Sequence, residues 1–103
     1  MINIQETRES EIIRRFVISV STNNDPSSIL RDKLATILTK EYHFRYEGTT
    51  LYIGDCSEKN LRLLIDRLKH EALKSEWPRM LAHLNVIEGG QTRFRYRPKT
   101  GRR

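Results

Sequence analysis

The segment Arg14–Ser21, with the sequence RRFVISVS, decides the fold that we predict for this chain of 103 residues. Phe16, Ile18 and Val20 fall on one side of an extended chain. Such alternation of β-forming residues is typical of a strand with one face against a core. Val17 falls on the other side. We therefore expect a central strand that is covered on one face and partly shielded on the other.

A first helix is predicted directly after this strand. Asp25 can cap the helix N-terminus, and Pro26 suits the first helical position. Apolar residues then recur on one helical face up to about Lys40. They are Ile29, Leu30, Leu34, Ile37 and Leu38. This face is expected to pack on the side of the strand that carries Phe16.

Two short strands are predicted next, at Tyr42–Tyr46 and Thr49–Ile53. Glu47 and Gly48 connect them, and a glycine in such a short connection is typical of a β-hairpin. The side chains expected to point at the helices are those of Phe44, Leu51 and Ile53.

A second helix is predicted from Ser57, a natural N-cap, with Glu58 placed where an acid favours the helix dipole. Its apolar residues have the clearest helical spacing in the chain. They are Leu61, Leu64, Ile65, Leu68 and Ala72. Pro78 excludes the helical conformation for the residue before it, so we expect the helix to end near Ser75.

The segment Ala82–Glu88 is predicted to be a further strand, with Leu84 and Val86 directed inward. Gly89 and Gly90 then turn the chain. Residues 91–98 fit two interpretations, a fifth strand at the edge of the sheet or an extended arm. The sequence leaves both open.

This order of elements predicts an α+β protein with the ferredoxin-like split β-α-β-β-α-β arrangement, in which two helices cover one face of an antiparallel sheet. Residues 14–92 would form this domain. A flexible N-terminus, residues 1–13, would precede it, and a basic arm, residues 93–103, would follow it. The sheet face without helices is expected to carry Arg15, Val17, Arg45, Tyr52, His83 and Asn85.

The positive charge of the chain is concentrated near its C-terminal end. The chain has 19 Lys and Arg against 13 Asp and Glu, a formal net charge of +6. Six of the basic residues lie in Arg93–Arg103, which contains no acidic residue, so the rest of the chain has 13 of each sign. A dense cationic strip is typical of phosphate binding through counterion release. A solvated tail that aids solubility is the alternative.

Arginine alternates with aromatic residues in Tyr42–Tyr46 and in Phe94–Arg97. Arginine binds phosphate bidentately, and aromatic rings stack on bases of any identity. The alternative explanation is ordinary strand alternation, with one ring of each pair in the core. We predict an interface with RNA, or with another polyanion, at Arg15, Arg45, Tyr46, Tyr52, Arg93, Arg95, Tyr96, Arg97, Lys99, Arg102 and Arg103.

The sequence contains no strong catalytic motif, and it assigns no catalytic residue. Gly89–Gln91 has the tripeptide found at the tip of peptide-release factors, but a hairpin turn explains its two glycines. The three histidines have no metal-ligand spacing, so we expect neither a metal nor a cofactor. His83 is a candidate general acid or base on the open face. Cys56 is not expected to be an activated thiolate, because the neighbouring charge of Asp55 raises its pKa.

Between Phe16 and Ile87 the chain resembles the GhoS-type antitoxins of type V toxin–antitoxin systems. The likeness lies in the length, the element order, the strand Thr50–Ile53 that leads into an N-capped helix, and the later strand Leu84–Val86. The resemblance implies a ferredoxin-like endoribonuclease that cleaves the messenger of its toxin. The basic arm departs from that family, and no catalytic residue matches a family motif.

The sequence therefore predicts a small cytoplasmic regulatory protein that binds RNA, with endoribonuclease activity left open. A non-enzymatic interaction module or inhibitor, whose basic arm docks on an acidic protein partner, is the alternative. We also expect that the Val17 and Tyr52 side of the sheet forms a homodimer interface. The cytoplasm is expected because the chain has a single cysteine, no signal peptide and no apolar run that could span a membrane.

Overall fold

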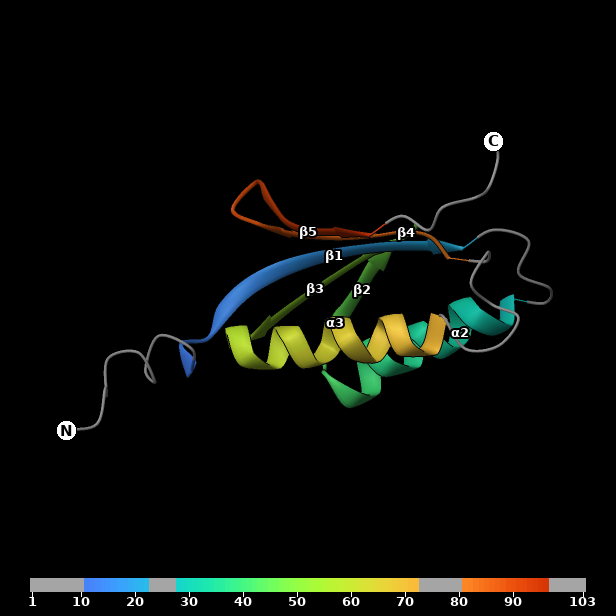
Figure 1. Ribbon diagram of the computed structural model, residues 1–103, viewed down its shortest axis with the longest axis horizontal. Helices are drawn as coiled ribbons and strands as arrows, with labels where there is room; N and C mark the ends of the chain where they lie inside the picture. Colours follow the sequence, from blue (N-terminus) through green and yellow to red (C-terminus); the bar gives the residue numbers. More distant parts are fainter. Residues whose placement is uncertain (1–10, 23–27, 73–80, 97–103) are drawn as a thin grey trace.

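A computed structural model describes residues 11–22, 28–72 and 81–96 of the chain (Figure 1). In these residues two helices cover one face of an antiparallel sheet, as predicted, and the sheet has five strands. The elements are β1 (Arg14–Thr22), α2 (Ile29–Thr36), its π-helical continuation η2 (Ile37–Glu41), β2 (Arg45–Gly48), β3 (Leu51–Cys56), α3 (Glu58–Ala72), β4 (Leu81–Glu88) and β5 (Gln91–Tyr96).

The strands are arranged in the order β2-β3-β1-β4-β5, with β1 in the centre. The connection from β1 through α2 to β2 passes over β3, and that from β3 through α3 to β4 passes over β1. This is the ferredoxin-like arrangement with one additional strand at the β4 edge. The predicted fold class is therefore confirmed.

The core lies between the sheet and the helices. Phe16, Ile18 and Val20 point into it from β1, and Leu84 and Val86 point into it from β4, as predicted. The helices contribute Leu30, Leu34, Ile37, Leu38, Leu61, Leu64, Ile65, Leu68 and Ala72. Both predicted apolar helix faces thus form the second layer of the core, with the exception of Ile29, which is 47% exposed.

The strand β3 has the opposite orientation to the one predicted. Tyr52 pairs with the buried Ile18 and is only 5% exposed, whereas Leu51 is 39% exposed. The expectation that Leu51 and Ile53 face the helices, with Tyr52 on the open face, is wrong. The hairpin begins and ends later than predicted, since its turn lies at Thr49 and Thr50.

Phe44 is buried as predicted, and it lies directly over Gly54. A Cβ atom at residue 54 would stand 2.5 Å from two carbon atoms of the Phe44 ring. The absence of a side chain at residue 54 therefore makes room for this ring between β3 and the helical layer.

The first helix changes its hydrogen-bonding pattern near its end. The Tyr42 N–H donates to the carbonyl oxygen of Ile37 at 3.1 Å, five residues back, as in a π-helix. The Thr36 and Thr39 hydroxyls each donate to the carbonyl oxygen four residues earlier, at 2.9 and 2.8 Å. The predicted start at Asp25 and Pro26 lies outside the described residues.

The helix α3 begins as predicted. The Ser57 side-chain oxygen accepts a hydrogen bond from the Asn60 N–H at 3.1 Å, which satisfies one of the free donors of the first turn. Glu58 is the acidic residue of that turn. The predicted helix end near Ser75 lies outside the described residues.

The structure selects one of the two interpretations of residues 91–98, because Gln91–Tyr96 forms β5 at the sheet edge. Gly89 and Gly90 have φ values of 58° and 82°, so both occupy the left-handed region that a two-residue hairpin turn requires. Residues 93–96, which the sequence analysis assigned to the arm, therefore belong to the sheet. Neither helix of the described segments has the length and apolar character that a membrane span needs.

Candidate nucleic-acid interface

The strand β5 places two aromatic rings beside the helix α3. Phe94 and Tyr96 are half-buried and pack against the core. The Lys69 ammonium of α3 lies 5.5 Å from the centroid of the Phe94 ring and 5.8 Å from that of Tyr96. Both distances are within the range of a cation–π contact. We call Lys69, Phe94 and Tyr96, together with Arg95 on the other face of the same edge strand, the β5 surface.

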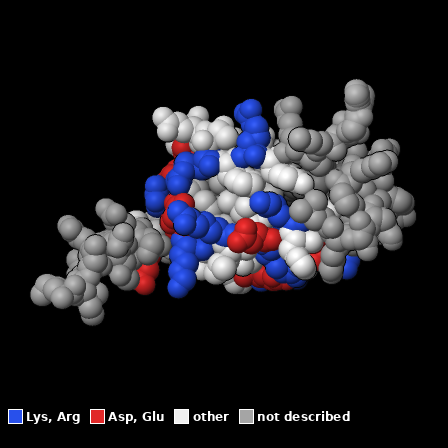
Figure 2. Space-filling view, in the orientation of Figure 1, with Lys and Arg blue, Asp and Glu red and all other residues white. Residues whose placement is uncertain are grey.

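Basic side chains surround this surface. Figure 2 shows Lys and Arg side chains gathered along the β5 and α3 side of the molecule, with carboxylates between some of them. Lys69 and Arg95 are two of the cations that form no ion pair with any described carboxylate. Lys69 lies over the two rings, whereas Arg95 pairs with Asn85 and therefore projects from the other face of the same edge strand.

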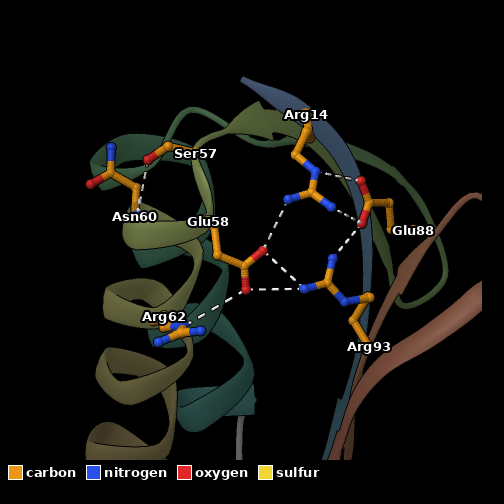
Figure 3. A network of polar contacts seen from close by, with 7 residues as sticks. All are labelled: Arg14, Ser57, Glu58, Asn60, Arg62, Glu88 and Arg93. Atoms are coloured by element: carbon orange, nitrogen blue, oxygen red, sulfur yellow. Dashed lines mark hydrogen bonds and ion pairs between the residues drawn. The ribbon is translucent and has the colours of Figure 1, made fainter. Parts of the chain in front are cut away.

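Arg93 is part of an ion-pair network that joins β1, β4, β5 and α3 (Figure 3). It donates to both carboxylate oxygens of Glu58, at 2.9 and 3.0 Å, and to Glu88. Arg14 donates to Glu88 at 2.9 and 3.1 Å and lies 3.4 Å from Glu58. The network therefore alternates two arginines with two carboxylates, and Arg62 adds a third cation 3.7 Å from Glu58.

The network changes the acidity of its members. Partial burial raises the pKa of Glu88, but the hydrogen bonds from Arg14 and Arg93 together outweigh this effect and lower it. The pKa of Arg93 is raised, chiefly by its hydrogen bond to Glu58. Arg93 is therefore held charged and already compensated.

The bulge between Val86 and Ile87 separates Arg93 from Arg95. Val86 pairs with Phe94 and Ile87 with Thr92, so Arg93 is the extra residue of β5. Its guanidinium reaches the start of α3, whereas Arg95 pairs across the ladder with Asn85. The two arginines thus have different surroundings, which simple alternation along the strand did not predict.

The other two predicted arginines in the described residues are also compensated. Arg15 donates to both carboxylate oxygens of Asp55, at 2.9 and 3.1 Å, and this hydrogen bonding lowers the pKa of Asp55. Arg45 pairs with Glu47. The remaining predicted cations, Arg97, Lys99, Arg102 and Arg103, lie outside the described residues.

The predicted tyrosines of the β2–β3 hairpin lie at the other edge of the sheet. Tyr46 is 54% exposed, and its ring centroid is 5.2 Å from that of Tyr52, with an interplanar angle of 49°. The pKa of Tyr52 is raised, first by burial of its side chain and then by electrostatic interaction with Tyr46. The two rings border a groove of about 310 Å³ that is also lined by Arg31, Asp32, Ala35, Thr39 and Thr49. Since β2 and β5 are opposite edge strands, these rings do not join the β5 surface.

His83 lies on the open face, as predicted, within a chain of hydroxyl groups. Its Nε2 is 2.9 Å from the Ser19 hydroxyl oxygen, and its Nδ1 is 2.9 Å from that of Ser21. The Ser19 hydroxyl is in turn 3.1 Å from that of Thr50. A neutral imidazole has one donor and one acceptor nitrogen, so one serine accepts a hydrogen bond while the other donates one. The sequence analysis missed these serines, although the strand alternation places both on the Val17 side of β1.

The described residues, 11–22, 28–72 and 81–96, contain no group of three or more His, Cys, Asp or Glu that could hold a metal ion. Cys56 is buried, and this burial, followed by the charges of Asp55 and Glu58, raises the pKa of its thiol to about 11. The expectation that Cys56 is not an activated thiolate is therefore confirmed, with burial as the larger cause.

The sequence analysis also missed Lys69, because helical spacing alone does not show that it lies over the rings of β5. Comparisons of the chain with protein-family models, with curated proteins and with solved structures find no match.

Proposed function

We propose that this protein binds single-stranded RNA, or a chemically similar polyanion, along the β5 surface and the basic residues that follow it in sequence. The chain has a net charge of +6, and Arg97, Lys99, Arg102 and Arg103 directly follow β5. Phosphates would contact the cations, and the exposed parts of the rings would contact bases.

The main support for the proposal is that some basic side chains already pair with a carboxylate of the protein, whereas others do not. Arg15, Arg45 and Arg93 each pair with a carboxylate, whereas Arg95 does not pair with one in the described residues. Lys69 is likewise uncompensated and lies above two rings. A polyanion gains most where cations have no internal partner, because no existing ion pair must be broken.

The open face of the sheet supports nucleic-acid binding less well. Of the arginines on this face, Arg15 and Arg45 already pair with Asp55 and Glu47, and Arg95 lies at its β5 edge. Tyr46, Tyr52, Phe94 and Tyr96 all lie on the helix side of the described sheet, so the open face offers no stacking ring from these strands. Cleavage of RNA at His83 would need a phosphate on this face. Pure protein is therefore expected to bind RNA without cleaving it, with or without EDTA.

The test is the affinity for a single-stranded RNA as a function of salt. Each phosphate contact contributes about −0.7 to the slope of log K against log salt for a single strand. The double variant Lys69→Gln/Arg95→Gln should therefore reduce the steepness of the slope by about 1.4 and weaken binding to all sequences alike. Arg45→Gln is the matched control, because Arg45 is exposed but compensated, and its slope should equal that of the wild type.

Two outcomes would contradict the proposal. One is an unchanged slope and affinity in the double variant. The other is a pull-down in which an acidic protein remains bound after nuclease treatment. This result would identify the basic residues as a protein-docking segment.

A further inference from the structure

A groove of about 310 Å³ lies between the first helix and the β2–β3 hairpin. Arg31, Asp32 and Ala35 line it from α2, and Tyr46 and Tyr52 line it from the hairpin. We call it the tyrosine groove. Its volume is at the lower end of the range of about 300–1,000 Å³ that is typical of small-molecule sites. The groove borders β2, the edge strand opposite β5, so the β5 surface does not contribute to it.

Tyr52 is a buried polar side chain whose hydroxyl group has hydrogen-bonding capacity to spare. The residue is only 5% exposed, and its hydroxyl forms no hydrogen bond within the part of the chain that the structure describes. The charges of Arg31 and Asp32, which both line the groove, act on the phenol group and affect its pKa. The hydroxyl is therefore directed at the groove. A buried donor without a partner costs free energy, so this arrangement points to a ligand that accepts its hydrogen bond.

Tyr46 supplies an aromatic wall for the groove. It is 54% exposed, and its ring is tilted by 49° against the ring of Tyr52 at a centroid distance of 5.2 Å. Its hydroxyl donates to the carbonyl oxygen of Thr49 at 3.2 Å, which fixes the position of the ring. An exposed ring that is held in this way can stack on a flat ligand.

The charged residues of the groove restrict the chemistry of such a ligand. Arg31 and Asp32 contribute one charge of each sign, so the groove has no net charge that would favour an anion or a cation. The Asp32 carboxylate forms no ion pair or side-chain hydrogen bond with any described residue and can accept a hydrogen bond. The suitable ligand is therefore a neutral, flat ring that carries a donor and an acceptor on one edge.

Nucleobases have this combination of properties. Adenine, for example, has its N6 amino donor next to its N7 acceptor. Proteins that bind unpaired bases stack them on aromatic side chains and form hydrogen bonds along the base edge. An apolar ring, by contrast, would leave the Tyr52 hydroxyl without an acceptor.

We propose that the tyrosine groove binds a single nucleobase, either of a free nucleotide or of a nucleic-acid strand. The base stacks on Tyr46, accepts a hydrogen bond from the Tyr52 hydroxyl and donates one to the Asp32 carboxylate. The site does not depend on RNA binding at the β5 surface, because the two lie at opposite edges of the sheet. The sequence analysis placed Tyr52 with Val17 in a homodimer interface, but Tyr52 lies on the helix side of the sheet and Val17 on the open face.

The experiment is an NMR titration of the tyrosine ring signals with adenosine monophosphate. Ribose phosphate is the matched ligand, because it keeps the sugar and the phosphate but has no base. The nucleotide should shift the signals of Tyr46 and Tyr52, whereas ribose phosphate should leave them unchanged.

Tyr52→Phe removes only the hydroxyl group. It should weaken nucleotide binding about 5- to 10-fold, the effect of one lost hydrogen bond. The melting temperature should stay at the wild-type value, because the hydroxyl has no partner in the described part of the chain. This combination separates ligand binding from a structural role. Tyr96→Phe is the matched control at the opposite sheet edge and should bind the nucleotide like the wild type.

Tyr46→Leu is a second variant, at an exposed position, and should weaken binding about 5-fold or more through lost stacking. A single-stranded oligoadenylate distinguishes the two sources of the base. Tyr52→Phe weakens its binding if a base of the strand enters the groove, and leaves it unchanged if the groove takes a free nucleotide. Equal shifts with adenosine monophosphate and ribose phosphate would overturn the proposal, as would equal nucleotide affinities of Tyr52→Phe and the wild type.

Discussion

Arg93 donates two hydrogen bonds to the carboxylate of Glu58 and so connects the edge strand β5 to the first turn of α3. Glu58 lies directly after the N-cap Ser57, where a carboxylate also interacts favourably with the helix dipole. The same carboxylate is within 3.4 Å of Arg14, at the start of β1. One acidic residue thus links the central strand, the edge strand and a helix.

Replacing Arg93 with Gln should lower the melting temperature. The side chain is 30% exposed and its partner Glu58 is 19% exposed, so water screens the ion pair only in part. A loss of about 1 kcal/mol corresponds to a decrease of about 4–8 °C for a domain of this size. Arg95→Gln is the control and should leave the melting temperature unchanged. A decrease of the same size in both variants would show that Arg93 has no special role in stability.

Truncation distinguishes the strand β5 from the residues that follow it. A chain that ends at Tyr96 keeps the whole of β5 and should melt near the wild-type temperature. A chain that ends at Glu88 loses Phe94 and Tyr96, which pack against the core, as well as the ladder with β4. It should lose at least as much stability as Leu64→Ala, for which burial at 0% exposure predicts about 2–5 kcal/mol. Equal denaturation midpoints for the two truncated chains would contradict this.

Gly54→Ala should destabilise the fold through a steric clash. The added methyl group would lie 2.5 Å from the Phe44 ring, and overpacking of this kind typically costs about 1–3 kcal/mol. The same substitution is also made in a Phe44→Leu variant, whose smaller side chain leaves room for the added methyl group. Chemical denaturation of the four proteins in this cycle should show that Gly54→Ala costs less with Leu at residue 44. Additive losses would mean that the ring does not contact the glycine.

Cys56 should make stability depend on alkaline pH. Its pKa is about 11 in the folded protein against 9.0 for an unperturbed thiol, so the folded state holds the proton more tightly. This contribution is fully present below pH 9 and is lost as the pH rises through 11. Melting temperatures measured from pH 8 to pH 11 should therefore fall less steeply in Cys56→Ala than in the wild type. Parallel curves for the two proteins would contradict the raised pKa.

The element order was predictable because three signals are local in the sequence. The alternation around Ile18 indicates a strand, the spacing of Leu61 and Leu64 indicates a helix, and Ser57 marks where that helix begins. Each signal depends only on neighbours within a few residues, and the structure confirms all three.

The orientation of β3 was not predictable in this way. Leu51 and Ile53 alternate with Tyr52, and aliphatic residues are the usual choice for a core. The observed choice depends on two contacts between distant segments, the pairing of Tyr52 with Ile18 and the packing of Phe44 over Gly54. An alternating pattern gives two faces and cannot say which one meets the helices.

The candidate site was only partly predictable for a related reason. A count of charges finds the basic segment, but it does not show which cations have internal partners. Arg93 and Arg95 look equivalent in the sequence, yet a β-bulge turns one of them to Glu58. Lys69 joins the rings of β5 through the packing of α3 on the sheet, which no local pattern contains.

The central position of β1 has a consequence for how the protein is made. β1 leaves the ribosome before the other strands, but its two neighbours are β3 and β4, and its first residue Arg14 pairs with Glu88, 74 residues later. Translation proceeds at about 5–20 residues per second. The backbone groups of Arg14–Ser21 that later pair with β4 therefore stay unpaired for on the order of ten seconds of synthesis. Chaperones that recognise extended apolar segments would meet this strand first, and the nascent chain is most prone to aggregation before β4 emerges.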